Sequence, residues 1–480
     1  MHDSLAIDFN EVEYSYLPGL KPLSQISFGI KKGERVCLLG RNGSGKSTLL
    51  RLAAGLLQPQ HGEISIDGIS TGDVRMIKQI RSKVGFIFQN PEDQIISTTV
   101  ESDVAFALEN LAVPTEEMKG RVSSVLERFA ISHLTKRHPM TLSAGEKQRL
   151  ALASMMVVKP EILLLDEPTS FLDARGKRLL FDTVFDDHMK TILAATQYPG
   201  EVDKYERVIF LDSHGIVFDG PSGGFKNTSF WSDMNTGESR KAWNPEEANH
   251  SETGALTHAP KSNDNRAAII VRELSFEFES NRSVFQGLNL EIPRNKITAI
   301  TGDSGCGKTT LALLLTGLIK PNRGVILVGQ DLSDPDAQST GQVAVIFQFP
   351  ESSFFAETVF EEVAFGVKDL KLSRDELKQR VADSLRLVGL SHEEFASRNP
   401  FTLSAGEQRR VAIAAVLIMD RLIVIFDETA IGLDWEGRRA IGELLQNLKR
   451  SGKTIILMTH DLDFVERHAD LLIRIGENHS

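Results

Sequence analysis

The stretch GRNGSGKS, from Gly40 to Ser47, decides the fold, and it has the spacing Gly-x-x-x-x-Gly-Lys-Ser. An apolar, strand-like run at 36–39 precedes it, and residues 48–57 have the spacing of a helix. A strand, a glycine loop and a helix in this order are the setting in which the motif cradles phosphate. The loop glycines let the backbone approach an anion closely, and Lys46 adds a positive charge. We therefore predict a polyphosphate site at this loop.

Four motifs of the chain occur twice. GDSGCGKT, from Gly302 to Thr309, repeats the opening stretch, and IFQ, TLSAGE and an aliphatic-DE run repeat as well. The matching residues and their separations are Lys46 and Lys308 (262), Gln89 and Gln348 (259), Ser143 and Ser404 (261), and Asp166 and Asp427 (261). Four landmarks at nearly one separation predict two equal domains, although length alone suggests about three. We predict domains at 5–221 and 266–480. Residues 222–265, rich in Gly, Ser, Asn and Pro, are predicted to be a linker with a short helix near Phe230.

The composition is that of a soluble globular protein, with 41% apolar and 25% charged residues. A net charge of −11 disfavours free nucleic acid as the main ligand. Cys37 and Cys306 are the only cysteines, which predicts no disulfide framework, a reducing compartment and buried packing roles. The longest apolar run, 411–419, has nine residues, and the N-terminus is acidic. We expect neither a membrane span nor a secretory signal.

Each half also carries an Asp-Glu pair at the end of an aliphatic strand. The pairs are Asp166-Glu167 after 162–165 and Asp427-Glu428 after 422–426. An acid at the carboxyl end of such a strand faces the crevice where α/β sheets bind ligands. We expect each Asp to hold Mg²⁺ opposite Ser47 or Thr309, and each Glu to polarise an attacking water. The alternation of strands and helices, the latter at 115–130 and 373–388, predicts an α/β fold with a covered parallel core.

LSAGE, at 142–146 and 403–407, precedes each aliphatic-DE strand, and this resembles the signature of ATP-binding cassette ATPases. The resemblance covers nearly all of the chain outside the linker. It implies two tandem P-loop NTPase domains, each with a RecA-like parallel core, an antiparallel β subdomain and a helical subdomain. It also implies an ATPase coupled to transmembrane transport, with ATP and Mg²⁺ as cofactors.

In that family two cassettes pack head to tail, and each ATP lies between one phosphate loop and the other cassette's signature. The first site would then bind nucleotide through Gly40, Arg41, Asn42, Gly43, Ser44, Gly45, Lys46, Ser47 and Thr48, with Ser404, Ala405 and Gly406. The second would use Gly302, Asp303, Ser304, Gly305, Cys306, Gly307, Lys308, Thr309 and Thr310, with Ser143, Ala144 and Gly145. The implied metal residues are Ser47, Gln89, Asp166, Thr309, Gln348 and Asp427.

Two further positions match family roles. Tyr16 and Phe278 each lie 30 residues before the loop lysine and match the aromatic on which adenine stacks; the alternative is that each is a core aromatic. The switch histidine of the family is His460 in the second half, but the matching residue of the first half is Gln197. Glutamine can donate a hydrogen bond but cannot carry a proton. With Glu167 and Glu428 as catalytic residues, we predict that the second site hydrolyses ATP faster.

The sequence that begins at Gln89 is QNPEDQIISTTVESDVAF, and the sequence that begins at Gln348 is QFPESSFFAETVFEEVAF. It is similar to the cassette subunits of energy-coupling factor (ECF) transporters, which import vitamins, metal ions or related micronutrients. This implies a peripheral protein at the cytoplasmic face of the cell membrane, partnered by a transmembrane scaffold (T-type) protein and a substrate-binding S-type subunit, without nucleic acid. Ile95, Ile96, Phe354 and Phe355 are candidate scaffold contacts, or else padding of the helical subdomain.

Two alternatives stay open. One is a fused ATPase of a sugar or nucleoside importer, although Gln-x-Pro-Glu in both halves is not expected there. The other is a soluble twin-cassette ATPase acting on ribosomes, which the slightly acidic linker, broken by Gly and Pro, disfavours. The transported solute cannot be derived from the sequence.

Overall fold

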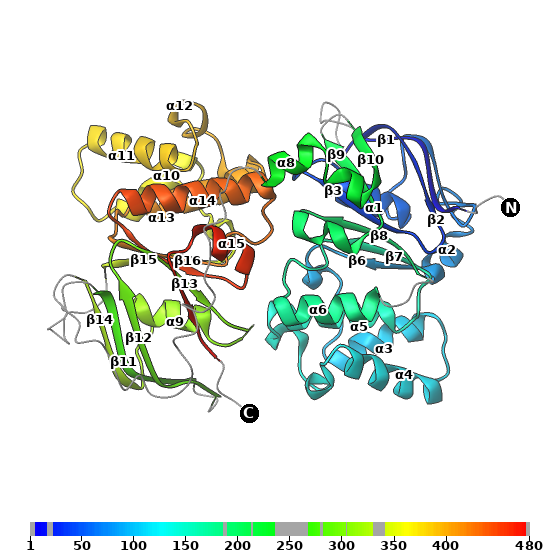
Figure 1. Ribbon diagram of the computed structural model, residues 1–480, viewed down its shortest axis with the longest axis horizontal. Helices are drawn as coiled ribbons and strands as arrows, with labels where there is room; N and C mark the ends of the chain where they lie inside the picture. Colours follow the sequence, from blue (N-terminus) through cyan, green and yellow to red (C-terminus); the bar gives the residue numbers. More distant parts are fainter. Residues whose placement is uncertain are drawn as a thin grey trace. The chain divides into compact units, whose positions relative to one another are not determined.

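The computed structural model describes residues 5–16, 23–185, 190–212, 215–235, 267–278, 282–303, 305–329 and 341–476. Its contacts divide the chain into two compact units, whose described parts are chiefly residues 5–235 (unit 1) and 267–476 (unit 2). Figure 1 shows unit 1 in blue to green and unit 2 in green to red. Each unit is described by itself.

Unit 1 contains two β-sheets among its described residues. The larger has the order β10-β9-β3-β8-β7-β6, and all its pairs are parallel except β10 with β9. The smaller has the order β2-β1-β4-β5 and is antiparallel. The strands are β1 Leu5–Tyr14, β2 Leu23–Lys31, β3 Arg35–Gly40, β4 His61–Ile66, β5 Ile69–Ser70, β6 Val84–Ile87, β7 Ile162–Asp166, β8 Thr191–Thr196, β9 Arg207–Asp212 and β10 Gly215–Pro221.

The helices of unit 1 cover the larger sheet and add a helical layer. Helices α3, α4 and α5 pack on one another and lie together at the end of the unit opposite β1 and β2 (Figure 1). The helices are α1 Lys46–Ala53, α2 Ile77–Lys83, α3 Val100–Asn110, α4 Thr115–Arg128, α5 Ala144–Met156, α6 Ala174–Val184, α7 Ser222–Phe225 and α8 Ser229–Asn235. Helix α1 is shorter than the predicted 48–57 segment because Gly55, at φ 65°, turns the chain into the left-handed region.

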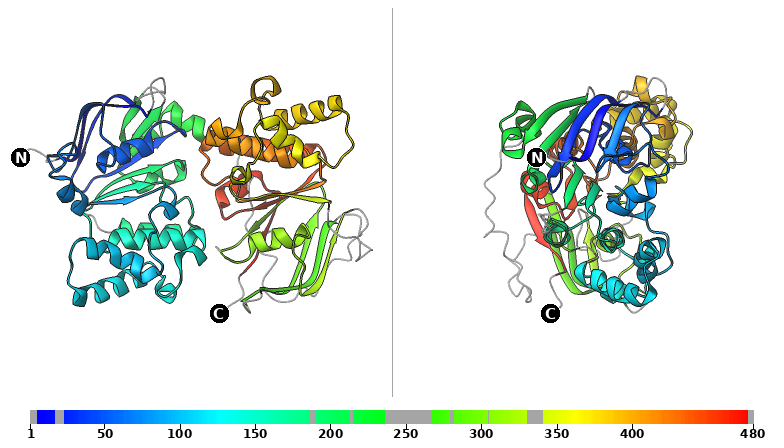
Figure 2. Two further views of the ribbon diagram at one scale, coloured as in Figure 1. Left: turned by 180° about the vertical axis from the view of Figure 1, so that it is seen from behind. Right: turned by 90° about the vertical axis from the view of Figure 1, so that its right-hand side faces the viewer.

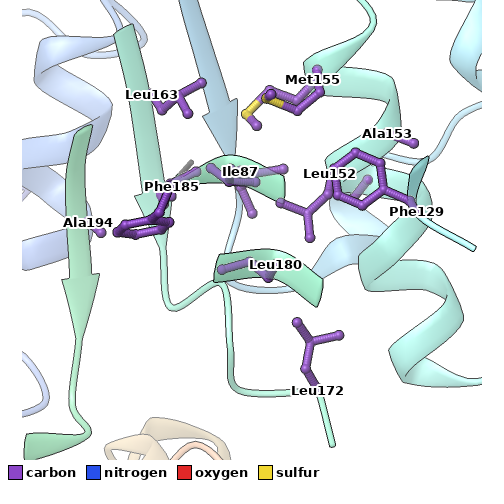
Figure 3. Close-up of a cluster of buried hydrophobic side chains, with 14 of the residues drawn as sticks. Ile87, Phe129, Leu152, Ala153, Met155, Leu163, Leu172, Leu180, Phe185 and Ala194 are labelled. Carbon is purple, nitrogen blue, oxygen red and sulfur yellow. The ribbon is translucent and has the colours of Figure 1, made fainter. Parts of the chain in front are cut away.

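The larger sheet of unit 1 is buried on both faces, as a parallel sheet requires. Successive residues of β7 point to opposite faces: Leu163 and Leu165 join one apolar cluster, and Ile162 and Leu164 join the other. Figure 3 shows the first cluster, in which Ile87, Leu163 and Ala194 from the strands meet side chains of the neighbouring helices. The helical side chains labelled there include Leu152 and Met155 of α5 and Leu180 of α6. This packing fixes the strand ends that carry the motifs.

Unit 2 repeats this plan. Its sheets have the orders β15-β16-β17-β13-β18, parallel throughout, and β12-β11-β14, antiparallel. The view from behind shows α9 beside both sheets (Figure 2). The strands are β11 Ala267–Phe278, β12 Arg282–Pro293, β13 Ile297–Thr301, β14 Arg323–Val328, β15 Val343–Ile346, β16 Ile423–Asp427, β17 Thr454–Met458 and β18 Leu471–Arg474. The helices are α9 Lys308–Leu315, α10 Val359–Ala364, α11 Arg374–Leu387, α12 His392–Phe395, α13 Ala405–Leu417, α14 Trp435–Arg450 and α15 Leu462–His468.

The predicted fold class is confirmed: each unit has a parallel core, an antiparallel β subdomain and a helical subdomain. Part of the predicted linker packs on unit 1, where Phe225 and Met234 of α7 and α8 are buried in the core; the rest, 236–265, lies outside the described residues. The domain boundaries stay a prediction. Cys37 is buried, Cys306 is partly buried and both are free. Among the described helices, none is long and apolar enough to cross a membrane.

Candidate functional site

The glycine loop of unit 1 joins β3 to α1 and wraps around its own lysine. Gly45 is the N-cap of α1 at φ 99°, and a Cβ there would lie 2.5 Å from Leu23 Cδ2, so only glycine fits. The Lys46 ammonium donates hydrogen bonds to the carbonyl oxygens of Gly40 (2.7 Å) and Arg41 (2.8 Å). Burial lowers the pKa of Lys46, and the nearby carboxylates oppose this. The loop from Gly40 to Thr48 thus surrounds a buried ammonium with its own backbone, and its role as a phosphate cradle stays a prediction.

The loop of unit 2 has the same construction. Gly307 caps α9 at φ 103°, and Lys308 Nζ donates to the carbonyl oxygens of Gly302 (2.7 Å) and Asp303 (3.3 Å). Lys308 Nζ also lies 3.9 Å from Glu428 Oε1. Burial raises the pKa of the Cys306 thiol, which favours a packing role. Ser304, predicted to bind nucleotide, lies outside the described residues.

Each loop places a hydroxyl against the Asp that ends the next strand but one of the same sheet. Ser47 Oγ donates to Asp166 Oδ1 (3.0 Å), and Thr309 Oγ1 donates to Asp427 Oδ2 (2.7 Å). The other oxygen of each carboxylate, Asp166 Oδ2 or Asp427 Oδ1, is buried without a hydrogen-bond partner in the described part of the chain. Burial raises the pKa of both carboxyls, that of Asp427 to about 6. A divalent cation would supply the missing partner, so this oxygen donor set fits Mg²⁺.

The two predicted glutamines, Gln89 and Gln348, follow β6 and β15. Gln89 is exposed, but it lies close enough to Glu167 to stabilise the charged form of that carboxyl. Gln348 is half-buried. Their role as metal ligands stays a prediction.

The predicted catalytic glutamate of unit 1 lies in a strained and buried position. Glu167 has φ 48°, and its N–H donates to the Ala195 carbonyl of β8 (2.9 Å). Its Oε2 accepts hydrogen bonds from Gln197 Nε2 (2.8 Å) and Ser170 Oγ (3.0 Å). Burial raises the pKa of Glu167 to about 7, which is near the operating range of a general base.

The matching glutamate of unit 2 has a different partner. Glu428 has φ 52°, and its N–H donates to the Met458 carbonyl of β17 (2.9 Å). Glu428 Oε1 lies 2.9 Å from His460 Nδ1, where the tautomer decides which atom donates. The structure therefore brings Gln197 and His460 to the same place in their units, beside the carboxylate of Glu167 or Glu428. Gln197 is fully buried, and its Oε1 has no hydrogen-bond partner among the described residues.

The candidate adenine platforms are exposed. Tyr16 and Phe278 have exposed fractions of 51% and 44%, so the alternative of a core aromatic does not describe them. Each rests edge-on against an aromatic two residues earlier, Tyr14 or Phe276, with ring centroids 5.0 Å apart. The Tyr16 hydroxyl also lies 3.4 Å from Thr48 Oγ1. An exposed, braced ring suits base stacking.

The signature motifs begin helices. Ser143 and Ser404 are the N-caps of α5 and α13, each in a capping box with the Glu three residues later. Ala144 and Gly145, and Ala405 and Gly406, form the first turns, whose free N–H groups attract an anion. The pairing of each signature with the other unit's phosphate loop stays a prediction.

Sequence reasoning missed two residues beside the catalytic loops. Ser170 holds Glu167 in unit 1, whereas the residue at the matching position of unit 2 is Ile431. Arg409 of α13 is buried against the loop after Glu428, whereas unit 1 has Gln148 at the matching position. A residue-by-residue comparison of the two halves would have revealed both differences.

A family model described as ABC transporter matches residues 23–170 and again residues 285–430. A relative from Bifidobacterium longum, named "Putative ABC transporter ATP-binding protein BL0043", is 32% identical; the comparison covers 97% of this chain and 64% of the relative, so the chain spans about two thirds of that protein's length. "Putative HMP/thiamine import ATP-binding protein YkoD" of Bacillus subtilis is 30% identical, with 96% of this chain and 88% of the relative covered.

Among solved structures, cbiO1 from Clostridium perfringens, described as part of the ABC transporter complex cbiONQ, is 31% identical. The match covers 48% of this chain and 95% of that chain, with a TM-score of 0.43.

Proposed function

The chain belongs to the ABC transporter family, and we propose that it is the ATP-hydrolysing subunit of an ECF-type importer. In this proposal it lies peripherally at the cytoplasmic face of the cell membrane and powers a separate transmembrane scaffold and a substrate-binding subunit. The solute would be a vitamin, a metal ion or a related micronutrient. The name of the Bacillus subtilis relative, which refers to HMP/thiamine import, supports import of this class.

The observation that carries the proposal is a set of exposed apolar residues, called the apolar patch below, that recurs at matching positions in both units. Four pairs of matching residues are exposed. Their exposed fractions are Ile96 61% and Phe355 59%, Phe106 41% and Phe365 45%, Leu111 45% and Leu370 51%, and Met140 67% and Phe401 60%. Soluble surfaces rarely keep such apolar groups without a partner. All eight residues lie between the repeated glutamine and the signature serine of their unit, which supports a docking surface in this segment.

In unit 2 two members of this patch lie against each other, and a third lies against the half-buried Phe354. The rings of Phe355 and Phe365 are 4.6 Å apart, and those of Phe354 and Phe401 are 6.2 Å apart, both edge to face. Of the four candidate contact residues, Ile96 and Phe355 are exposed, and Phe354 is half-buried beside Phe401. Ile95 instead packs against the core of unit 1, which is the padding role. The docking contacts are therefore expected from Ile96, Phe354 and Phe355.

The chemistry proposed for each unit uses the groups already described. Lys46 and Lys308 would neutralise phosphate charge, and the hydroxyl–carboxylate pairs Ser47–Asp166 and Thr309–Asp427 would hold Mg²⁺. Bound Mg²⁺ supplies charge stabilisation to the phosphoryl oxygens. Glu167 and Glu428 would accept the proton of the attacking water. Head-to-tail closure of the two units around ATP stays a prediction.

Co-purification tests the docking surface. The full chain, produced in its own cells and extracted in mild detergent, should carry membrane proteins with it. Phe355→Asp should reduce the recovered membrane protein at least tenfold, because a desolvated carboxylate opposes apolar docking. Leu318→Asp is the matched control, since Leu318 is 64% exposed outside the patch and should leave recovery unchanged. Thermal unfolding of both variants checks that they fold.

Two results would contradict the proposal. One is recovery of ribosomes instead of membrane protein, lost as salt is raised, which would favour the ribosome-associated alternative. The other is equal recovery with Phe355→Asp and wild type. Recovery of a membrane pair that transports a sugar or a nucleoside would favour the other importer class.

A further inference from the structure

A single buried arginine joins two functional segments of unit 2. Arg409 lies on α13 and is 6% exposed. Its Nη2 and Nε face the carboxylate of Glu351, at 3.1 and 3.4 Å, in a two-bond ion pair. Its Nη1 donates to the carbonyl oxygens of Ile431 (2.6 Å) and Thr429 (3.4 Å). The guanidinium therefore bridges the Gln-x-Pro-Glu segment and the loop that follows the catalytic glutamate.

The guanidinium also stacks on an aromatic ring. Its Cζ atom lies over the ring of Phe349, 5.3 Å from the ring centroid. Phe349 follows Gln348 and adopts φ 55°, a conformation that costs energy for an aromatic residue unless its surroundings favour it. The side chains of Arg409 and Glu351 are only 7% and 18% exposed. Solvent screens this pair little, so its geometry is held tightly.

Unit 1 divides the same contacts between two residues. Gln148, at the position of Arg409, is fully buried and donates to the Pro168 carbonyl (3.0 Å), which matches Thr429. Glu92, at the position of Glu351, is instead paired with Lys147, and its side chain is 50% exposed. A neutral amide thus contacts the loop after Glu167, while a separate ion pair, half-exposed on its Glu92 side, contacts the Gln-x-Pro-Glu segment. The mechanical link between them is missing at this position.

We propose that Arg409 is a positioning residue that couples the docking segment of unit 2 to its catalytic loop. The proposal rests on the proposed function, because Phe354 and Phe355 of the docking patch follow Glu351 within four residues. At the other end, Thr429 directly follows Glu428. Movement of the apolar patch is passed through Glu351 and Arg409 to the backbone that holds Glu428. Unit 2 is the unit whose hydrolysis responds directly to the membrane partner, and unit 1 is coupled more weakly.

The test is a double-variant cycle on the purified full chain, without membrane partner. Arg409→Gln installs the residue of unit 1, which can still reach the Thr429 carbonyl but loses Glu351. Glu351→Gln is nearly isosteric and keeps every donor of Arg409, so it serves if the first variant folds poorly. Lys147→Gln, which breaks the more exposed pair of unit 1, is the matched control.

We expect Arg409→Gln and Glu351→Gln each to lower kcat about tenfold, because a small displacement of a catalytic group costs this much or more. The KM for ATP should stay within about twofold, since neither residue contacts the phosphate loop. The double variant should be no slower than the slower single variant, because both changes remove one link. Lys147→Gln should change kcat less than about twofold.

Three outcomes would overturn the coupling role: unchanged kcat in Arg409→Gln and Glu351→Gln, losses that multiply in the double variant, or an equal loss in Lys147→Gln. Because the assay needs no membrane partner, failure of the co-purification test would leave these results standing. Conversely, if the chain recovers membrane protein normally but Arg409→Gln and Glu351→Gln act independently on kcat, only the role proposed for Arg409 is rejected.

Discussion

The buried carboxyl of Glu167 should make the stability of unit 1 depend on pH. Burial raises its pKa from about 4.5 to about 7 in the folded chain. A carboxyl with a raised folded pKa favours the fold in its protonated form, so its contribution is complete at low pH and is lost as pH rises through 7. A shift of about 2.5 pH units corresponds to roughly 3 kcal/mol, of which less than about 1 kcal/mol is lost by pH 5. Between pH 5 and pH 8 the loss is about 2–3 kcal/mol.

Glu167→Gln removes this titration while keeping the size of the side chain. The amide is neutral at both pH values and can still accept a hydrogen bond from Gln197 or Ser170. The difference in unfolding free energy, variant minus wild type, should therefore become more positive by about 2–3 kcal/mol from pH 5 to pH 8. The variant thus gains stability relative to wild type as the pH rises. The catalytic carboxylate is thus expected to cost stability at the pH where it works.

Trp231 allows unit 1 to be followed by itself. It packs edge-on against Phe225 of the unit 1 core, with ring centroids 6.1 Å apart. In a background with Trp243→Phe and Trp435→Phe it is the only tryptophan, and its fluorescence reports urea unfolding of this unit. Ser123→Ala, at an exposed position of α4, changes no titrating group and is the control; its difference from wild type should not vary with pH. A difference for Glu167→Gln that stays constant from pH 5 to pH 8, or widens with the opposite sign, would refute the reasoning.

Two further predictions concern catalysis. In single-turnover ATP hydrolysis, Glu428→Gln should lower the total rate more than Glu167→Gln does, because His460 can carry a proton whereas Gln197 cannot. Loss of a positioned acid–base group lowers a rate about 10²–10⁴-fold. Equal losses in the two variants would reject the predicted asymmetry between the sites. Asp427→Asn should raise the Mg²⁺ concentration for half-maximal hydrolysis about 10–100-fold, measured by Mg²⁺ titration at fixed ATP. An unchanged titration would remove Asp427 from the metal site.

Motifs set by the local chain were predictable from the sequence. The glycine loops, the strands ending in Asp-Glu and the capped signature helices depend on residues a few positions apart, and all are present. The meeting of Glu167 with Gln197 was also predictable, because neighbouring parallel strands β7 and β8 end at the same edge of the sheet. These contacts follow from the backbone framework alone.

Contacts that depend on side-chain packing between distant segments were not predictable. Arg409 meets Glu351 and Ile431, which lie 58 and 22 residues away, only because α13 packs under both segments. The sequence also could not separate Ile95 from Ile96, since which of two adjacent apolar residues faces the core is decided by the turn before α3. Packing, rather than motif, assigns these roles.

The two units differ in the side chains that surround the predicted catalytic carboxylate. In unit 1 an amide and a hydroxyl, from Gln197 and Ser170, hold Glu167. In unit 2 an imidazole and a more distant ammonium, from His460 and Lys308, face Glu428. The loop lysine acts on the carboxylate in both units, because Lys46 also favours the charged form of Glu167. The units therefore differ in an amide and a hydroxyl against an imidazole, and of these groups an imidazole alone can carry a proton. Because both backbones present the glutamate in the same way, with φ near 50°, we expect the predicted difference in rate between the sites to arise from these side chains.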